Sequence, residues 1–343
     1  MQKTPIAVSV MSALTMEQRH DQSLLSLQDG VIPSLRVATF EARQSALTVG
    51  IRGIVPFDAN QTARDQGVGV YIDGVYLGRQ HGLNAALFDV ERIEVLRGPQ
   101  GTLFGRNTEG GALSIVTKAP TGQFGGRVVA GVGTYGSYNM ELHQDFQEFS
   151  GVSVKVDALV QHQDPTTKNP MNGQAGWNQY DRKGGRVTAL YNPNDRFSAQ
   201  VSVDYAKDYN TPFFSQLLSY NPYGKRVRTL AEVTAVAAAP AGTINPLAPL
   251  VKVHTDRQSV SDIGTVQQPS LDETGGASAT LKYKVSPDLE LRSITAVRAV
   301  GAEPVGQLGH RKPQRFRAEH HLWSLQPVGP LSEPVQPGIP GRR

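Results

Sequence analysis

Apolar and polar residues alternate along several segments in the middle of the chain. Five small or β-branched apolar residues form one row, Val152, Val154, Val156, Ala158 and Val160. Ser153, Lys155, Asp157 and Gln161 occupy the opposite row, which Leu159 interrupts. Because successive side chains of a strand point to opposite faces, this pattern predicts a strand with one apolar and one polar face. Residues 197 to 205 and 277 to 285 repeat the design.

Alternation and turn signals together predict seven strands after about residue 122. They span residues 123–133, 138–147, 151–163, 182–192, 197–208, 276–286 and 288–298. Strands of about ten residues with one apolar face are typical of the wall of a transmembrane β-barrel. A soluble antiparallel sheet with one wet face gives the same pattern, so alternation alone leaves both open. The connection from 209 to 275 is long and polar, which predicts a loop.

The first 120 residues show a different, mixed α/β pattern. Thr15 with Gln18 fits a helix capping box. The leucines within residues 24–27 suggest a second short helix, which must end before Pro33. Residues 68–77 contain an Asp-Gly pair between two apolar runs, and this predicts a hairpin because Asp-Gly supplies the positive φ angles of a two-residue turn.

A glycine-rich segment lies at the C-terminal end of this first region. Two short apolar strands, residues 93–96 and 112–117, flank a turn that carries Arg97 and Arg106. So many glycines beside so few large apolar groups would make a poor free-standing core. We therefore expect this segment to be held inside a larger structure.

Residues 90–118 (VERIEVLRGPQGTLFGRNTEGGALSIVTK) closely resemble the plug domain of TonB-dependent outer-membrane receptors. The resemblance continues, in the correct order, through residues 4–10 (TPIAVSV), 51–54 (IRGI) and 68–79 (VGVYIDGVYLGR). It implies an α+β plug domain over residues 1–120, followed over residues 121–300 by an incomplete antiparallel transmembrane-type β-barrel. The function implied is TonB-energised uptake of a scarce nutrient, most commonly an iron–siderophore complex, across the outer membrane. The implied partners are the TonB complex, outer-membrane lipid and a small-molecule ligand, with no cofactor.

The resemblance also implies roles for individual residues. Plug arginines of this family are expected to pair with carboxylates on the inner barrel wall and lock the plug, which assigns a lock to Arg52, Arg97 and Arg106. Bidentate arginine–carboxylate pairs suit a lock because their geometry is specific. Two apical plug loops are candidates for ligand binding, with the side chains Phe57, Asp58, Asn60, Arg79, Gln80 and His81.

Several expected features of such receptors are not found in this sequence. No signal peptide or TonB box precedes the plug-like segment, and 22 barrel strands would need roughly 220 residues. Residues 301–343 contain seven prolines, a density that argues against barrel strands and predicts a disordered or frameshifted tail. We therefore expect the chain to be a fragment, truncated at both ends, that does not transport by itself. The tail histidines His310, His320 and His321 are expected to be incidental rather than metal ligands.

The amino-acid composition excludes several other classes of functional site. The 343 residues include no cysteine, which excludes disulfides, thiolate metal sites and a cysteine nucleophile. The net charge of +4 comes largely from the last residues, without the basic face and stacking aromatics of a nucleic-acid-binding protein. No apolar run is long enough for a transmembrane helix.

One motif favours a different class of protein. Gly131-Val-Gly-Thr-Tyr-Gly136 is a G-x-G-x-x-G sequence with Asp157 about twenty residues further on, which is formally a dinucleotide-binding fingerprint. A soluble nicotinamide-dependent oxidoreductase is thus one alternative, and a β-rich interaction protein without transport is another. The polar residues after the motif disfavour the parallel sheet that the first alternative needs. No nucleophile–histidine–carboxylate set, Walker A loop or metal-ligand spacing is found, and Asp73 is interpreted as a turn residue, so we do not expect an enzyme.

Overall fold

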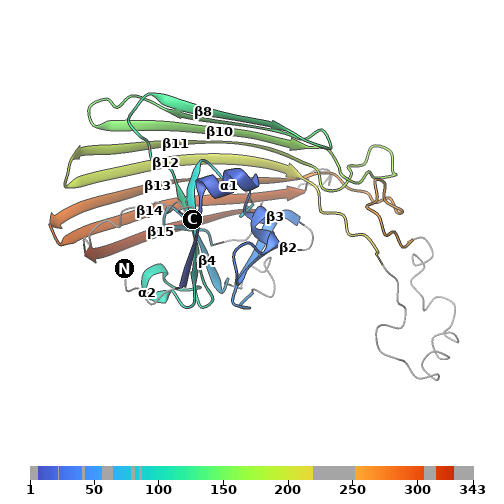
Figure 1. The fold of residues 1–343 in the computed structure, drawn as a ribbon, viewed down its shortest axis with the longest axis horizontal. Coiled ribbons are helices and arrows are strands. Elements are labelled where there is room, and N and C mark those ends of the chain that lie inside the picture. The colour runs from blue at the N-terminus through green and yellow to red at the C-terminus, as the bar shows by residue number, and fades with distance from the viewer. Residues whose placement is uncertain are drawn as a thin grey trace, which may run out of the picture.

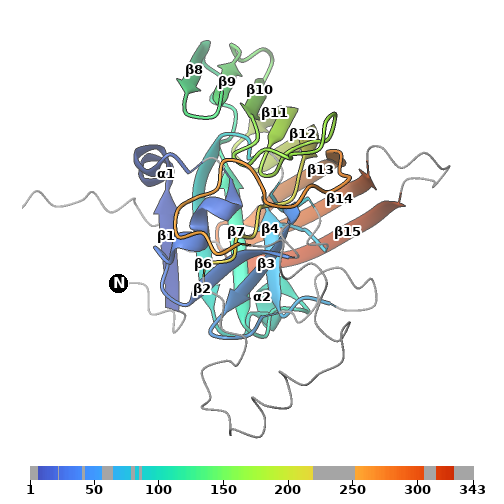
Figure 2. The same cartoon turned by 90° about the vertical axis from the view of Figure 1, so that its right-hand side faces the viewer.

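Two sheets of different construction lie side by side in the computed structural model of the chain (Figure 1). The structure describes residues 7–21, 23–40, 43–55, 65–78, 82–84, 87–218, 252–304 and 314–327. A five-stranded mixed sheet with short helices forms the first part of the molecule, here called the plug. An eight-stranded antiparallel sheet, here called the wall, curves along one side of it (Figure 2).

The plug sheet has the strand order β1-β6-β7-β4-β5. Its strands are β1 (Ala7–Ser12), β4 (Val68–Ile72), β5 (Val75–Tyr76), β6 (Val90–Arg97) and β7 (Gly111–Thr117). Strands β4 and β7 run parallel, and the other neighbours run antiparallel. The glycine-rich segment thus lies within a small mixed sheet, and its two predicted strands are neighbours.

Short helices and a separate hairpin complete the plug. These elements are α1 (Ala13–Arg19), the 3₁₀ helix η1 (Leu24–Asp29), α2 (Gly101–Phe104), β2 (Leu35–Phe40) and β3 (Arg43–Ile51). The predicted capping box is wrong: the hydroxyl of Ser12 accepts a hydrogen bond from the Thr15 N–H, so Ser12 is the N-cap and the helix begins at Ala13. The short helix before Pro33 is confirmed.

The Asp-Gly hairpin forms as predicted between β4 and β5. Asp73 and Gly74 have φ angles of 51° and 84°, the left-handed values that this turn requires. A Cβ on Gly74 would lie 2.8 Å from Ile294 Cδ1 in the wall. The hairpin tip therefore meets the wall so closely that position 74 has no room for a side chain.

The wall contains all seven predicted strands and one more. Its strands are β8 (Gly125–Val132), β9 (Tyr138–Asp145), β10 (Val152–Gln163), β11 (Tyr180–Asn194), β12 (Phe197–Asn210), β13 (Ser270–Ser286), β14 (Leu289–Pro304) and β15 (Gln314–Pro327). They pair in sequence order, each antiparallel to the next. The short turns lie at one end of the wall and the longer connections at the other (Figure 1).

The prediction of a strandless tail from residue 301 is wrong. Strand β14 continues to Pro304, and β15 pairs with it from Gln314 to Pro327. The reason lies in the position of the prolines, since Pro313 and Pro327 flank a run that contains none. Proline excludes ladder hydrogen bonds only where it stands, so a proline-free run between two prolines can form a strand. His320 and His321 fall in this strand, and His310 lies outside the described residues.

The dinucleotide-binding interpretation is wrong. Gly131 lies at the end of β8, and β9 follows as an antiparallel strand after a tight turn. A dinucleotide fingerprint needs a helix whose N-terminus faces the pyrophosphate. The segment forms a hairpin instead, because Tyr138, Met140 and Leu142 follow a period of two.

Among the described residues, no helix is long and apolar enough to cross a membrane.

Burial is arranged oppositely in the two sheets. In the plug, apolar side chains such as Leu47, Ile93 and Leu113 form one core between the sheet, β3 and the helices. In the wall, the polar row of β10 is buried against the plug, whereas the apolar row is only half-buried. Strand β12 repeats this, with Ser202, Asp208 and Asn210 buried and the valines of the opposite row exposed.

Candidate functional site: the contact between plug and wall

Two apolar contacts anchor the plug to the wall. Val75, just after the hairpin turn, packs with Ile294 and Ala296 of β14. Phe88, just before β6, packs with Leu159 of β10 and Ala206 of β12. Leu159 is the residue that interrupts the polar row of β10, so its exception to the alternation is explained by its contact with the plug. These apolar side chains leave the surrounding polar groups in a largely water-free setting.

Asp73 joins the hairpin turn to the wall. Its carboxylate accepts hydrogen bonds from the backbone N–H and the hydroxyl of Thr117, both at 2.9 Å. Arg186 of β11 donates to the same carboxylate from Nη2 at 2.6 Å, and the Arg186 side chain is buried. One plug carboxylate therefore fixes the end of β7 and is paired with a cation of the wall.

Asp89 is contacted by three bases from three segments. Lys155 of β10 donates to Oδ2, Arg127 of β8 lies 3.2 Å from Oδ1, and Lys118 of the segment between the sheets lies 2.9 Å from Oδ1. Burial would raise the pKa of Asp89, but the hydrogen bonds from Lys155 and Lys118 outweigh it and hold the pKa below its ordinary value. The carboxylate is therefore ionised and is the point where plug, linking segment and wall meet.

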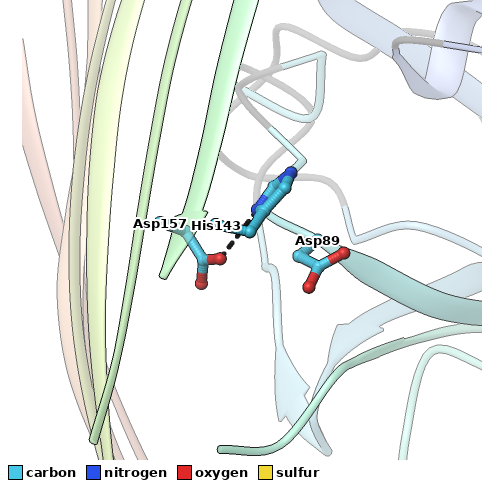
Figure 3. A group of neighbouring side chains, drawn as sticks. All are labelled: Asp89, His143 and Asp157. Carbon is cyan, nitrogen blue, oxygen red and sulfur yellow. Dashed lines mark hydrogen bonds and ion pairs between the residues drawn. The ribbon is translucent and has the colours of Figure 1, made fainter. Parts of the chain in front are cut away.

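A histidine and a second aspartate complete this charged group (Figure 3). His143 Nδ1 lies 2.8 Å from Asp157 Oδ1, and both side chains are buried. Asp89, His143 and Asp157 place potential metal ligand atoms within 4.8 Å of one another. The ammonium of Lys155 contacts Asp89 and lies 3.7 Å from Asp157, so the place that a metal cation would take is filled by a side chain of the protein.

A third polar contact lies toward the long-loop end of the wall. The Gln44 amide donates to the carbonyl oxygens of Gln179 and Thr211 at 3.1 and 2.8 Å. Arg182 of β11 donates to Asp208 of β12 at 2.9 Å and lies within 3.5 Å of the Gln44 side-chain oxygen. The plug is thus held at three separate points along the wall.

The arginines assigned to the lock have other neighbours. Arg97 donates to the hydroxyl of Ser9 in β1, and Arg106 lies 3.8 Å from Asp65 with 82% of its side chain exposed. Arg52 lies beside Gly98. Within the described residues, all these neighbours belong to the plug, so wall partners for the three arginines stay a prediction.

The plug–wall ion pairs described above have the opposite polarity from the one that the lock assignment expects. Aspartates of the plug meet bases of the wall, whereas sequence reasoning assigned arginines to the plug. The available signal was the polar row of β10, where Lys155 stands on a face shared with a serine, an aspartate and a glutamine. The six candidate ligand residues, Phe57, Asp58, Asn60, Arg79, Gln80 and His81, lie outside the described residues.

Comparison with known proteins identifies what this arrangement is similar to. Residues 1–112 match the model of the TonB-dependent receptor plug domain family. The pesticin receptor of Yersinia pestis is 29% identical over 167 residues, which is 48% of this chain and 24% of that receptor. The probable TonB-dependent siderophore receptor PiuA of Acinetobacter baumannii is 26% identical over 213 residues, 61% of this chain and 26% of that protein. The chain thus spans about a quarter of the length of these relatives.

The fold is shared with a solved receptor over nearly the whole chain. The crystal structure of the ferric yersiniabactin uptake receptor FyuA from Yersinia pestis superposes with a TM-score of 0.73 at 21% identity. The superposition covers 94% of this chain and 46% of that receptor. The five-stranded sheet with its helices and the antiparallel wall beside it therefore have the architecture of a plug and of part of a receptor barrel.

Proposed function

We propose that this chain, whose residues 1–112 are a TonB-dependent receptor plug domain, belongs to a gated transporter of the bacterial outer membrane. The proposed function is ligand-controlled passage, without covalent catalysis: the plug closes the lumen beside the wall, ligand binding is sensed by the plug, and TonB supplies the force that moves it. The nicotinamide-dependent alternative is not supported, because its glycine motif forms a hairpin between β8 and β9. Among the described residues, we find no feature that favours a non-transporting interaction protein.

The observation that carries the proposal is the reversed burial of the wall. A soluble sheet buries its apolar face and exposes its polar face. Here the polar face is covered by the plug, and the apolar face carries exposed side chains such as Val201, Val203 and Tyr205 along one strand. Water would not favour this arrangement, whereas a bilayer outside and a polar lumen inside would.

The proposed cargo is an iron–siderophore complex. The support is the function of similar proteins, which include a probable siderophore receptor and a ferric yersiniabactin uptake receptor. We place ligand contacts at the apical plug loops, with Phe57, Asp58 and Asn60 in one loop and Arg79, Gln80 and His81 in the other. Arginine suits the anionic iron-chelating groups of such ligands because its planar fork donates two hydrogen bonds to one carboxylate.

A growth experiment tests the transport function. The full gene is expressed in a Gram-negative host that lacks its own siderophore receptors, and growth under iron limitation is measured with single ferric siderophores. We expect rescue by one siderophore class, and loss of rescue when the host lacks TonB. Arg79→Ala should weaken rescue, while Arg36→Ala, at an exposed position of β2, serves as the matched control for loss of a plug arginine. No rescue by any siderophore, despite heat-modifiable protein in the outer membrane, would contradict the proposed cargo.

A further inference from the structure

Lys155 stands between two carboxylates that belong to different parts of the molecule. We propose that Lys155 is a two-position latch: its ammonium holds the seated plug through Asp89 and passes to Asp157, on its own strand, when the plug leaves. The inference rests on the proposed function, since it requires that the plug moves relative to the wall.

The first position is the one seen in the structure. Lys155 is 2% exposed and contacts Asp89, which lies on the plug just before β6. Lys118 and Arg127 also contact Asp89, but their side chains are more than a third exposed and can return to water when the plug leaves. Of the three bases, Lys155 is the one that the seated plug covers most completely, so its ammonium has the least contact with water.

The second position is already in place. Asp157 follows Lys155 by two residues on β10, so both side chains point to the plug-facing side of the wall. Asp157 Oδ1 lies 3.7 Å from the Lys155 ammonium, and His143 holds the same carboxylate from the neighbouring strand at 2.8 Å. A rotation about the end of the lysine side chain is enough to bring the ammonium into contact with Asp157.

This arrangement makes the lock reversible. Removing one partner of a buried ion pair is strongly unfavourable because it leaves an uncompensated charge. With Asp157 beside it, Lys155 exchanges one carboxylate for another when Asp89 is withdrawn, and the wall keeps a paired cation.

Asp157 also opposes the seated state directly. Oxygen atoms of Asp89 and Asp157 lie within 4.8 Å of each other, and like charges at this distance repel where little water screens them. Lys155 bridges the two carboxylates and offsets this repulsion while the plug is seated. Asp157 therefore stabilises the released state more than the seated state, so removing its charge should tighten the lock.

The expected effect of neutralising Asp157 on plug seating is the opposite of the effect expected for an ordinary salt-bridge network. If Asp157 only supported Lys155 in its present place, its neutralisation would loosen the plug. The direction of the effect thus distinguishes the two-position latch from a purely structural role.

The absence of cysteine from the sequence allows a direct measurement. Ala206→Cys places one thiol on the wall where Phe88 of the plug covers it. The full chain is embedded in outer-membrane vesicles, and the rate of labelling by a water-soluble maleimide reports how often the plug leaves this position. The labelling readout does not require transport, so failure of the latch proposal can be distinguished from failure of the cargo proposal.

In this background we expect Asp89→Asn to accelerate labelling by about tenfold or more, the factor that corresponds to losing a charge-assisted hydrogen bond. Asp157→Asn keeps an acceptor for His143 and should slow labelling about three- to tenfold. Asp204→Asn, which disrupts the ion pair with Arg298 within the wall, is the matched control and should leave the rate unchanged.

Faster or unchanged labelling of Asp157→Asn would overturn the two-position latch while leaving plug movement intact. No labelling in any variant, Asp89→Asn included, would contradict both the latch and the movement of the plug on which the proposed function depends.

Discussion

The plug and the wall both contain strands with rows of apolar residues, but they bury these rows differently. In the plug, β3 and β4 place their apolar residues in a common core, as in any water-soluble domain. In the wall, β10 and β12 turn their polar residues toward the plug and leave their apolar residues outside. The pattern of residues along a strand therefore defines two faces, but what lies against each face decides which one is interior.

The contact between the two sheets follows from this difference. The plug presents a closed apolar core and a polar exterior, and the wall presents a polar inner face to that exterior. Ion pairs such as Asp73–Arg186 join the two surfaces, with a few apolar side chains between them. A contact of this kind is specific, but it can be broken without exposing either hydrophobic core.

The largest expected effect is in the plug core. Leu113 is fully buried in β7, and Leu113→Ala should lower the free energy of unfolding of the plug by about 2–5 kcal/mol. The matched change in the wall is Leu281→Ala on β13, an outward leucine that is 41% exposed and fills no protein core. Urea titration followed by proteolysis of the plug in detergent measures both. Equal losses would show that the two sheets bury their leucines alike.

A charge on the outer face of the wall should have the next largest effect. Val203 of β12 is 55% exposed, and Val203→Lys should disfavour membrane insertion by about 2–4 kcal/mol if the residue lies near the bilayer midplane. The change in the free energy of insertion is measured by folding the protein into lipid vesicles over a urea series, with heat-modifiability as the readout.

The control for Val203→Lys tests whether the plug and the wall differ in what surrounds their exposed valines. Val10 of β1 in the plug is 60% exposed, and Val10→Lys should leave insertion unchanged because water surrounds it. If Val203→Lys is equally neutral and the chain stays folded in buffer without detergent, the wall is an ordinary soluble sheet, and the proposed membrane function is wrong.

Much of this architecture could be predicted from the sequence because it depends on local periodicity. The Asp-Gly hairpin and the seven wall strands follow from turn chemistry and from alternation, and the structure confirms both. The strand β15 was missed because proline content was averaged over the whole tail, although residues 314–326 of this strand contain no proline and Pro327 only ends it.

The site was less predictable because it joins residues far apart in the chain. Asp89 meets Lys155 across 66 residues, and Asp73 meets Arg186 across 113. Nothing near Asp73 distinguishes a turn aspartate from one that also binds a wall arginine. A partial signal existed at Leu159, since an apolar residue in a polar row requires an apolar neighbour, which proved to be Phe88.

Packing at the plug–wall contact should give a smaller effect. A Cβ on Gly184 of β11 would lie 2.9 Å from the Phe88 ring and 3.0 Å from Ala206, so Gly184→Ala should destabilise plug seating by about 1–3 kcal/mol. Gly125 of β8 has open space at the corresponding position, and Gly125→Ala is the matched control. Protease accessibility of the plug in the membrane-embedded chain measures the difference, and equal accessibility in the two variants would mean that Phe88 does not pack on the wall.

The smallest expected effect is a loss of plug seating in acid. The pKa of Asp89 lies below its ordinary value of 3.8, because hydrogen bonds from Lys155 and Lys118 outweigh burial. A carboxylate with a lowered pKa stabilises the state that lowers it at every pH above 3.8, and this contribution disappears as the pH falls through the lowered value. The effect should be modest because Lys118 and Arg127 are partly exposed and screened by solvent.

Plug protection against protease, measured from neutral pH downward, should therefore fall in acid more steeply in the unmodified chain than in Asp89→Asn, whose amide does not titrate. Parallel curves for the two proteins would show that other carboxylates govern the acid response and that Asp89 holds the plug less firmly than its three contacts imply.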